Sequence, residues 1–376
     1  MISNGKKIKV MVVDDSLIYR EAVSSIVSKM QGFEVIGSAA NGRIALEKIS
    51  QLKPDLLTLD IEMPEMNGIE VLKKIREDSI NVSSIILSSY TALGGDYTIT
   101  ALELGAFDFI LKPDSSVLND SLEVLQSAII PKLTTFAKYK EAKDILKWDN
   151  IMEQSRTIPS HRLSPDTDDW KSTLSKKHVR SEKIKSKVIA IGLATGGATA
   201  LASFIPQLPK SLGVPILIVQ RDIPSMFIRS LAEKINAQSA IKVMEAVDGL
   251  YLQPNIALIA PDEKHMMVEQ AFKGDAVVVR IKNDPPEYGC KPSIDYLFRS
   301  VSALYGEAAT GVILTGMGPD GIKGLMSMKE KGAVTIAQTP STCVVYGMAK
   351  GAIDAGVVDV VAPLDNIAAE IIHTCS

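Results

Sequence analysis

The chain has 376 residues, a length that predicts two or three domains. Hydrophobic residues make up 46% and charged residues 23%, with 41 Lys and Arg against 44 Asp and Glu. This composition excludes a disordered chain and a globally basic nucleic-acid-binding protein. Three cysteines without metal-ligand spacing do not form a disulfide scaffold, and no apolar run reaches the roughly 18 residues of a transmembrane helix. We expect a cytoplasmic multidomain protein with no nucleic-acid partner and no membrane insertion.

The first 133 residues alternate short apolar runs with amphipathic segments. The apolar runs predict five strands, at Lys9–Val13, Glu34–Ser38, Leu56–Leu59, Ser84–Ser88 and Phe107–Leu111. The amphipathic segments predict five helices, near residues 17–30, 42–52, 67–77, 97–104 and 119–133. Strands and helices that alternate in this way are typical of a parallel sheet covered on both faces.

The next segment, residues 134–187, has a different amino-acid composition. Between Lys138 and Lys187 there are 13 Lys and Arg against 8 Asp and Glu, with few apolar runs and many turn-forming residues. The segment is predicted to be an interdomain linker, with the fifth helix continuing into its start. Its charge suits a solvated tether, and a docking segment for a partner is the alternative.

A second alternating pattern covers residues 188–376. Its predicted strands are Val188–Ile191, Pro215–Val219, Ile256–Ile259, Ala276–Ile281, Gly311–Leu314 and Val334–Ala337. Its predicted helices are Ala198–Leu208, Met226–Asn236, Ile294–Leu304, Gly321–Lys331 and Leu364–His373. The pattern predicts a second doubly wound α/β domain.

Polar residues follow the strands of the first domain where each strand ends. Asp14 and Asp15 follow the first strand, Asp60 the third, Ser88 ends the fourth and Lys112 follows the fifth. The carboxyl ends of parallel strands meet at one edge, and carboxylates that meet there repel each other unless a cation joins them. Such oxygen ligands suit Mg²⁺, and a carboxylate beside Mg²⁺ can attack a phosphoryl group. One Asp alone at such a place is commonly a helix cap, so the prediction depends on the whole set.

The motifs DD, LTLDIEMPEMNG, LSS and KP at these strand ends resemble the receiver domain of two-component response regulators, over residues 7–133. The resemblance implies a flavodoxin-like fold and phosphorylation of Asp60. It implies that Mg²⁺ is held by Asp14, Asp15 and Asp60 with the backbone carbonyl of Glu62. It also assigns three further roles, a hydroxyl switch at Ser88, an aromatic switch at Phe109 and a phosphate contact at Lys112.

The second domain begins with a strand that runs into Gly192-Leu193-Ala194-Thr195-Gly196-Gly197 and a helix. Backbone N–H groups at such a turn suit a phosphate or an oxyanion. The motif lacks the Gly-Lys-Ser/Thr of a P-loop and is not the dinucleotide pattern GxGxxG. A tight turn without a ligand and a phosphate or nucleotide site with Arg221 nearby both stay open.

Later motifs follow in a characteristic order: PILIVQRDIPSMFIRSLAEKIN, NIALIAPDEKHM, KPSIDYLFRSV, ILTGMGPDGIKGL and IAQTPSTCVVYGMAKGAIDAG. Over residues 188–372 they resemble the catalytic domain of CheB-type protein-glutamate methylesterases. The resemblance implies a Rossmann-like fold and a serine-hydrolase triad acting on methyl esters of chemoreceptor glutamates. The family's serine position is Ala194 here, its histidine position is Arg221, and its aspartate is retained as Asp320.

The two substitutions argue against esterase chemistry. A methyl group cannot attack a carbonyl, and an Arg side chain stays protonated and cannot act as the base. Thr195 and Ser203 do not replace the serine, and His265, Cys290 and Cys343 are interpreted as structural residues. We expect Arg221 to pair with Asp320, because a buried unpaired carboxylate is expensive.

The resemblance therefore implies a phosphorylation-controlled response regulator of chemotaxis with little or no esterase activity. Its implied partners are a chemotaxis histidine kinase as phosphodonor and chemoreceptor cytoplasmic tails. In the family, the unphosphorylated receiver covers the active site and phosphorylation relieves the block. The alternative is a working methylesterase and glutamine deamidase with an altered site.

Overall fold

The computed structural model describes residues 7–89, 92–113, 118–154, 184–272 and 276–376. The central part of the expected linker, residues 155–183, lies outside them. The chain divides into two compact units, Met1–Pro159 and Ser160–Ser376, which are described separately here. Among the described helices, none combines the length and the apolar character needed to cross a membrane.

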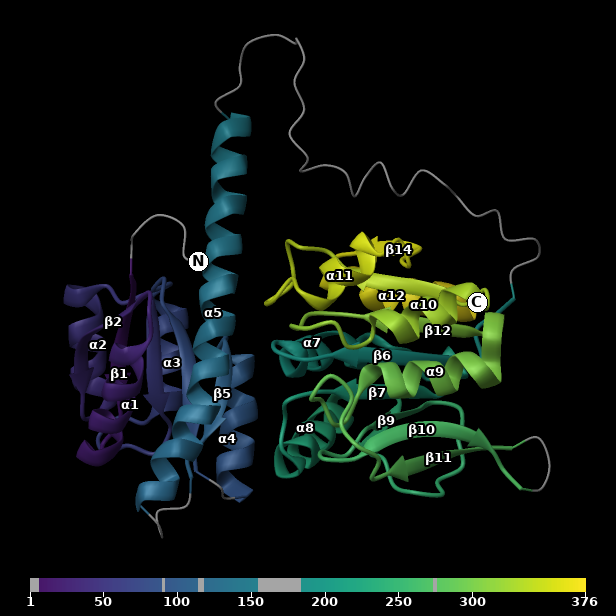
Figure 1. Cartoon of the computed structure of the whole chain (residues 1–376), viewed down its shortest axis with the longest axis horizontal. Coiled ribbons are helices and arrows are strands. Elements are labelled where there is room, and N and C mark those ends of the chain that lie inside the picture. The colour runs from purple at the N-terminus through teal and green to yellow at the C-terminus, as the bar shows by residue number, and fades with distance from the viewer. Residues whose placement is uncertain (1–6, 90–91, 114–117, 155–183, 273–275) are drawn as a thin grey trace. The chain divides into compact units, whose positions relative to one another are not determined.

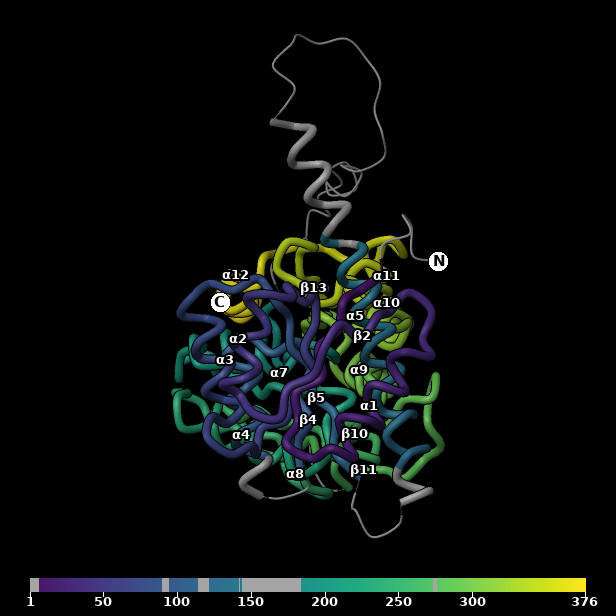
Figure 2. The backbone as a smooth tube through the Cα atoms, turned by 90° about the vertical axis from the view of Figure 1, so that its left-hand side faces the viewer, coloured from purple at the N-terminus to yellow at the C-terminus, as the bar shows by residue number. Residues whose placement is uncertain are grey.

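The first unit is a five-stranded parallel sheet with the order β2-β1-β3-β4-β5 (Figure 1). Its strands are β1 (Ile8–Val13), β2 (Phe33–Ala39), β3 (Leu56–Asp60), β4 (Ser83–Ser88) and β5 (Asp108–Leu111). Its helices are α1 (Leu17–Lys29), α2 (Gly42–Leu52), α3 (Gly68–Glu77), α4 (Ala92–Glu103) and α5 (Leu118–Gln154). Helices α1 and α5 cover one face, and α2, α3 and α4 the other (Figure 2). This is the expected flavodoxin-like arrangement.

Local side-chain caps fix where two of these helices begin. The Asn41 side chain accepts a hydrogen bond from the Ile44 amide at the start of α2, 2.9 Å long. At the start of α3, Asn67 and Glu70 form a reciprocal capping box. Each pair satisfies backbone N–H groups that a helix terminus leaves without a partner.

Helix α5 continues into the start of the expected linker, as predicted, and takes up its residues 134–154. Phe136 is 2% exposed, and its ring lies edge-on to Phe107 with centroids 5.2 Å apart. Further along, Lys140 Nζ lies 2.7 Å from Asp55 Oδ1. Apolar burial and one ion pair therefore continue the packing of α5 on the first unit beyond residue 133.

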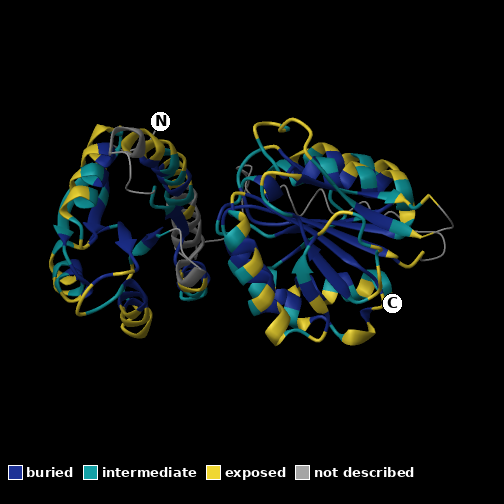
Figure 3. Ribbon diagram, turned by 90° about the horizontal axis from the view of Figure 1, so that it is seen from below, coloured by how far each residue is buried: buried dark blue, intermediate teal, exposed yellow. Residues whose placement is uncertain are grey.

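The second unit contains a seven-stranded parallel sheet with the order β14-β13-β12-β6-β7-β9-β8. Its strands are β6 (Val188–Leu193), β7 (Ile216–Gln220), β8 (Lys242–Glu245), β9 (Ile256–Ile259), β12 (Ala309–Ile313), β13 (Val334–Gln338) and β14 (Val360–Ala362). Its helices are α7 (Gly197–Phe204), α8 (Ser225–Gln238), α9 (Ile294–Tyr305), α10 (Ile322–Glu330), α11 (Met348–Asp354) and α12 (Leu364–Cys375). Figure 3 shows buried strands between helices whose outer sides are exposed. The predicted class of two doubly wound α/β domains is confirmed.

One predicted strand belongs to a different sheet. The run expected at Ala276–Ile281 forms β11 (Val277–Lys282), which pairs antiparallel with β10 (His265–Gln270) in a separate two-stranded sheet. Val278 and Val279 of β11 are buried. The apolar pattern alone therefore did not distinguish a hairpin strand from a strand of the central sheet. The short elements β8, β10, β14 and α11 were not predicted.

Candidate functional site

The first candidate site lies at the carboxyl ends of β1 and β3, neighbouring strands at the point where the strand order reverses. Asp14 follows β1 and is fully buried, and Asp60 ends β3 with 3% exposure. Lys112 follows β5, and its Nζ lies 2.8 Å from Asp14 Oδ2 and 2.8 Å from Asp60 Oδ2. One ammonium group thus bridges two buried carboxylates.

The carboxylates at this crevice carry more negative charge than the single positive charge of Lys112 neutralises. Oxygen atoms of Asp14, Asp15 and Asp60 all lie within 4.8 Å of one another. Burial, against the attraction of Lys112, raises the pKa of Asp60 to about 6 and also raises the pKa of Asp14. Three hard oxygen donors with one neighbouring cation fit a divalent ion such as Mg²⁺, which would relieve the cost of the buried charges.

Residues next to Asp60 complete the rim of this crevice. The backbone N–H of Glu62 points to Asp60 Oδ1 at 3.4 Å. The Glu62 side chain accepts a hydrogen bond of 3.1 Å from Ser89 Oγ. Glu62 is therefore held beside the predicted phosphorylation site from both its backbone and its side chain.

The two predicted switch residues are buried. Ser88 ends β4 with 1% exposure, and Thr98 Oγ1 of α4 donates a hydrogen bond of 2.8 Å to its hydroxyl. Phe109 of β5 is 4% exposed, and Lys132 Nζ lies 5.8 Å from its ring centroid. The hydrogen bond from Thr98 connects the end of β4 to helix α4.

Two residues of α1 also contact the crevice and were not predicted. Lys112 Nζ lies 4.7 Å from the Tyr19 ring centroid, and the Tyr19 hydroxyl donates to the Pro113 carbonyl at 2.9 Å. Arg20 Nη1 donates to the carbonyls of Asp14 and Asp15, at 2.7 and 2.8 Å. No motif marks either residue, because their contacts depend on how the first turn of α1 passes over the strand ends.

The second candidate site lies at the carboxyl ends of β6, β7 and β12. The strand order of the large sheet reverses at β6, which is the first of its strands along the chain. Ala194 follows β6, Arg221 follows β7, and Asp320 lies between β12 and α10. Gln220, the last residue of β7, donates through Nε2 to the carbonyls of Ala194 and Arg221, both at 2.9 Å. Gln220 thus connects Ala194 and Arg221, two of the residues that the sequence singled out, at the ends of neighbouring strands.

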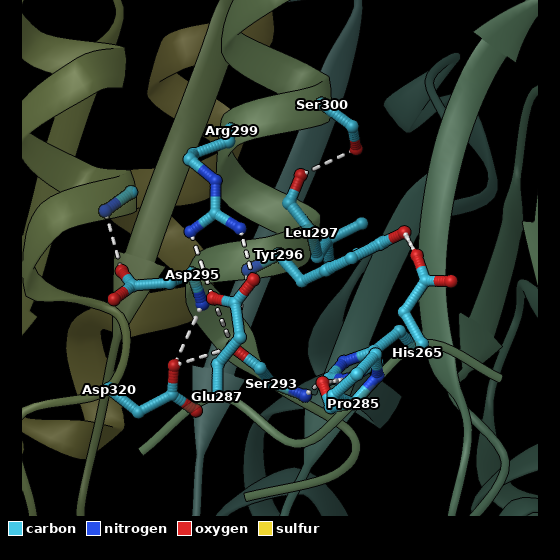
Figure 4. Close-up of polar contacts among 12 residues, drawn as sticks. His265, Pro285, Glu287, Ser293, Asp295, Tyr296, Leu297, Arg299, Ser300 and Asp320 are labelled. Atoms are coloured by element: carbon cyan, nitrogen blue, oxygen red, sulfur yellow. Dashed lines mark hydrogen bonds and ion pairs between the residues drawn. The ribbon is translucent and has the colours of Figure 1, made fainter. Parts of the chain in front are cut away.

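Asp320 is fully buried, and its carboxylate lies against the first turn of the neighbouring helix α9 (Figure 4). Its Oδ1 accepts hydrogen bonds from Ser293 Oγ at 2.8 Å and from the Asp295 amide at 3.0 Å. Its Oδ2 accepts one from the Ile294 amide at 2.9 Å. A carboxylate at a helix N-terminus is favourably placed, so these contacts stabilise the charge of Asp320.

Arg221 is 7% exposed and lies beside two carboxylates. Its Nη1 is 3.5 Å from Asp320 Oδ2, and its Nη2 is 3.7 Å from Asp222 Oδ2. The expected pairing of Arg221 with Asp320 is therefore present. Both distances are longer than those of a bidentate guanidinium–carboxylate pair.

Close packing accounts for the glycines of the turn that contains Ala194. A Cβ atom at Gly197 would lie 2.0 Å from Gln220 Oε1, and one at Gly192 would lie 2.3 Å from a methyl carbon of Ile294. Gly196 has a φ of 83°, a conformation that favours glycine. These reasons favour the tight-turn interpretation over a nucleotide site.

The residues weighed as substitute catalytic groups have structural roles or an unsuitable pKa. His265 is fully buried, and its Nδ1 accepts from the Ser293 amide at 3.2 Å, so its Nε2 donates to the Pro285 carbonyl at 3.1 Å. Burial raises the pKa of Cys290, and raises that of Cys343 to about 12. Two further histidines that do not match the family's base position, His161 and His178, lie outside the described residues.

Similarity to known proteins agrees with these two sites. Residues 10–123 match the family model described as Response regulator receiver domain, and residues 189–371 match CheB methylesterase. A protein-glutamate methylesterase/protein-glutamine glutaminase of Desulfotalea psychrophila is 45% identical over 374 residues, covering 98% of this chain and 99% of that protein. Proteins of the same name are 40% identical in Geobacillus kaustophilus (98% and 99% covered) and 39% identical in Bacillus subtilis (97% and 97% covered).

Among solved structures, the catalytic domain of Thermotoga maritima CheB methylesterase is 34% identical and covers 50% of this chain and 99% of that chain, with a TM-score of 0.48. Fold and sites define a response regulator with a receiver domain and a hydrolase-type α/β domain. The chain belongs to the family of CheB-type protein-glutamate methylesterases/protein-glutamine glutaminases.

Proposed function

We propose that the chain is a phosphorylation-controlled regulator of chemotaxis whose methylesterase-type domain has little or no esterase activity. One observation carries the proposal. Arg221 pairs with Asp320 and shares the Gln220 amide with Ala194, at the two positions where the family resemblance implies a histidine and a serine. Its output is binding to chemoreceptor tails in the cytoplasm, or use of the receiver as an acceptor of phosphoryl groups.

The chemistry of the substitutions supports this proposal. An acyl-enzyme needs a hydroxyl or thiol nucleophile, and the Ala194 methyl group supplies neither. The base must take up a proton near neutral pH, which an Arg side chain does not do. Loss of triad members in a serine protease lowers turnover by a factor on the order of 10⁶. We expect a loss of similar scale here.

The receiver is proposed to keep its phosphotransfer chemistry. Asp14, Asp15 and Asp60 would hold Mg²⁺ with the Glu62 carbonyl, and the ion would draw charge from the phosphoryl oxygens. An Asp60 oxygen attacks the phosphorus of a phosphohistidine of the kinase, so that an O–P bond forms as the P–N bond breaks. Lys112, already between the carboxylates, pairs with the transferred phosphoryl group.

The test measures methyl release from methylated receptor membranes by the full-length protein, with and without a phosphodonor. The double variant Ala194→Ser, Arg221→His is assayed alongside. The same double variant with the added substitution Asp60→Asn is the control for phosphorylation. We expect no release by the natural protein and release by the double variant, stimulated by the phosphodonor only when Asp60 is present. Release by the natural protein would overturn the proposal.

The alternative is a working methylesterase and deamidase with an altered nucleophile. It is favoured by the names of the relatives, which cover nearly the whole chain. Thr195→Ala and Ser203→Ala separate the two proposals if methyl release is seen. Loss of that release in one variant would identify the substitute nucleophile.

A further inference from the structure

Thr98 is a fully buried threonine in the middle of α4, and its hydroxyl contacts a strand of the sheet. A Thr in a helix commonly donates its hydroxyl to the carbonyl four residues earlier, as Thr100 does to Asp96 at 2.8 Å. Thr98 Oγ1 reaches outside the helix and donates to Ser88 Oγ at the end of β4, at 2.8 Å. Thr98 therefore connects α4 to the end of β4, and Thr100 offers a matched position on the same helix.

Ser88 lies between the strand ends that carry the phosphorylation site and its lysine. In the pairing of β3 with β4, Asp60 lies opposite Leu87, the residue before Ser88. On the other side of β4, the Lys112 amide donates to the Ser88 carbonyl at 2.8 Å. The backbone thus places Ser88 in the row of strand ends that forms the receiver crevice.

The two hydroxyls form a hydrogen-bonded chain with a definite direction. A hydroxyl has one proton to donate and two lone pairs that accept. Because Thr98 donates to Ser88, the Ser88 proton is directed to a different acceptor, and Ser88 Oγ contacts the Ser89 carbonyl at 3.5 Å. That contact is weak, since O–H···O bonds are roughly 2.5–3.0 Å long. A charged phosphoryl oxygen is a stronger acceptor, and donation from Thr98 makes the Ser88 O–H group a better donor.

From these contacts we infer that Thr98 is a positioning residue for the phosphorylation of Asp60. Thr98 holds the Ser88 hydroxyl as a donor, and the Ser88 O–H group turns from the Ser89 carbonyl to a phosphoryl oxygen on Asp60. The inference rests on the proposed phosphotransfer chemistry of the receiver and adds a residue to it. Thr98 and Ser88 are 0% and 1% exposed, so water does not compete for the bond between them.

The test titrates the full-length protein with beryllofluoride at a fixed Mg²⁺ concentration and follows the bound ion by fluorine NMR. Beryllofluoride has the shape and charge of a phosphoryl group, and its fluorine atoms accept hydrogen bonds. Thr98→Val removes the hydroxyl and keeps the shape of the side chain. One hydrogen bond corresponds to about a two- to tenfold change in affinity, and we expect the half-saturating concentration to rise by that factor.

Further variants check that the hydroxyl chain is responsible. Thr98→Ser keeps the donor and should retain most of the natural affinity, and the matched control Thr100→Val should leave the affinity unchanged. In a chain that carries Ser88→Ala, the added Thr98→Val should have no effect, because the acceptor of its hydrogen bond is gone. Affinity for Mg²⁺ alone should be the same in Thr98→Val and the natural chain, since neither hydroxyl belongs to the acidic cluster.

Beryllofluoride binding that Thr98→Val leaves unchanged or tightens would overturn the inference. An equal effect of Thr98→Val in the Ser88→Ala chain, or a parallel loss of Mg²⁺ affinity, would do the same. If Thr98→Val unfolds, Thr98→Cys takes its place with the same expectations, because a thiol is a weak donor.

The titration also separates this inference from the chemistry on which it rests. If the natural chain bound no beryllofluoride, the proposed phosphotransfer chemistry of the receiver and the inference would both fail. If the natural chain bound it and Thr98→Val bound it equally well, the inference alone would fail.

Discussion

Ser293 Oγ donates a hydrogen bond of 2.8 Å to Asp320 and accepts one of 3.3 Å from the Tyr296 amide. One hydroxyl therefore caps α9 and holds the carboxylate of the second site. The same residue donates its own backbone N–H to His265. Ser293 is the point at which the helix, the site and the β10 strand are joined.

The first prediction concerns Ser293. Ser293→Ala removes the cap and one hydrogen bond to a buried carboxylate, and we expect it to lower the free energy of unfolding of the second domain by about 1–3 kcal/mol. Denaturant unfolding measures the effect. The exposed Ser211→Ala is the control, and an equally small effect for both would contradict the role assigned to Ser293.

A second prediction concerns the pH dependence of stability through Asp295. Burial raises the pKa of Asp295 above its ordinary value of 3.8, so its ionised form destabilises the folded state. The Asp295 carboxyl group therefore costs no folding stability below pH 3.8, its ordinary pKa. It lowers the free energy of unfolding as the pH rises through its pKa in the folded protein. Asp295→Asn removes that loss, so the variant should gain stability relative to the natural chain between pH 4 and 7.

The measurement for Asp295 is the free energy of unfolding as a function of pH. Asp365→Asn, at the exposed first turn of α12, is the matched control and should show a smaller pH-dependent difference. A difference for Asp295→Asn that stays constant with pH would contradict the prediction.

Helix α5 gives a third prediction. Phe136→Ala should lower the free energy of unfolding of the receiver by about 3–5 kcal/mol, because a buried ring in contact with Phe107 is lost. Leu122→Ala on the same helix, at a position 46% exposed, should have a much smaller effect. If the two variants lowered the free energy of unfolding by the same small amount, the part of the helix beyond residue 133 would not belong to the receiver core.

The last prediction concerns Tyr19 as a positioning residue for Lys112. A cation–π contact is worth about 0.5–1 kcal/mol at such a site, so Tyr19→Leu should slow phosphorylation by a small-molecule phosphodonor roughly two- to fivefold. Tyr19→Phe keeps the ring and should retain most of the rate. Unfolding curves of both variants separate this effect from a loss of stability.

The crevice of the receiver was largely predictable from the sequence because it is built on strand ends. Asp14, Asp60 and Lys112 follow or end buried strands, and parallel strands bring their carboxyl ends to one edge. Tyr19 and Arg20 belong to a helix, and nothing in the local sequence says that its first turn reaches the same crevice. Their contacts follow from tertiary packing.

The second site was less accessible to sequence reasoning. Asp320 was found only through a family motif, and its partner Ser293 is 27 residues away on another element. Ser293 does carry a local signal, because a serine directly before an apolar periodic segment is a common helix cap. The β10–β11 hairpin could not be predicted, since an apolar run does not specify its pairing partner.

The amide of Gln220 holds the carbonyls of both Ala194 and Arg221. The backbone at these positions is therefore shaped by a residue other than Ala194 and Arg221. In evolutionary terms, the proposed loss of hydrolase chemistry would be shallow, because it would lie in two side chains and would leave the backbone that carries them in place.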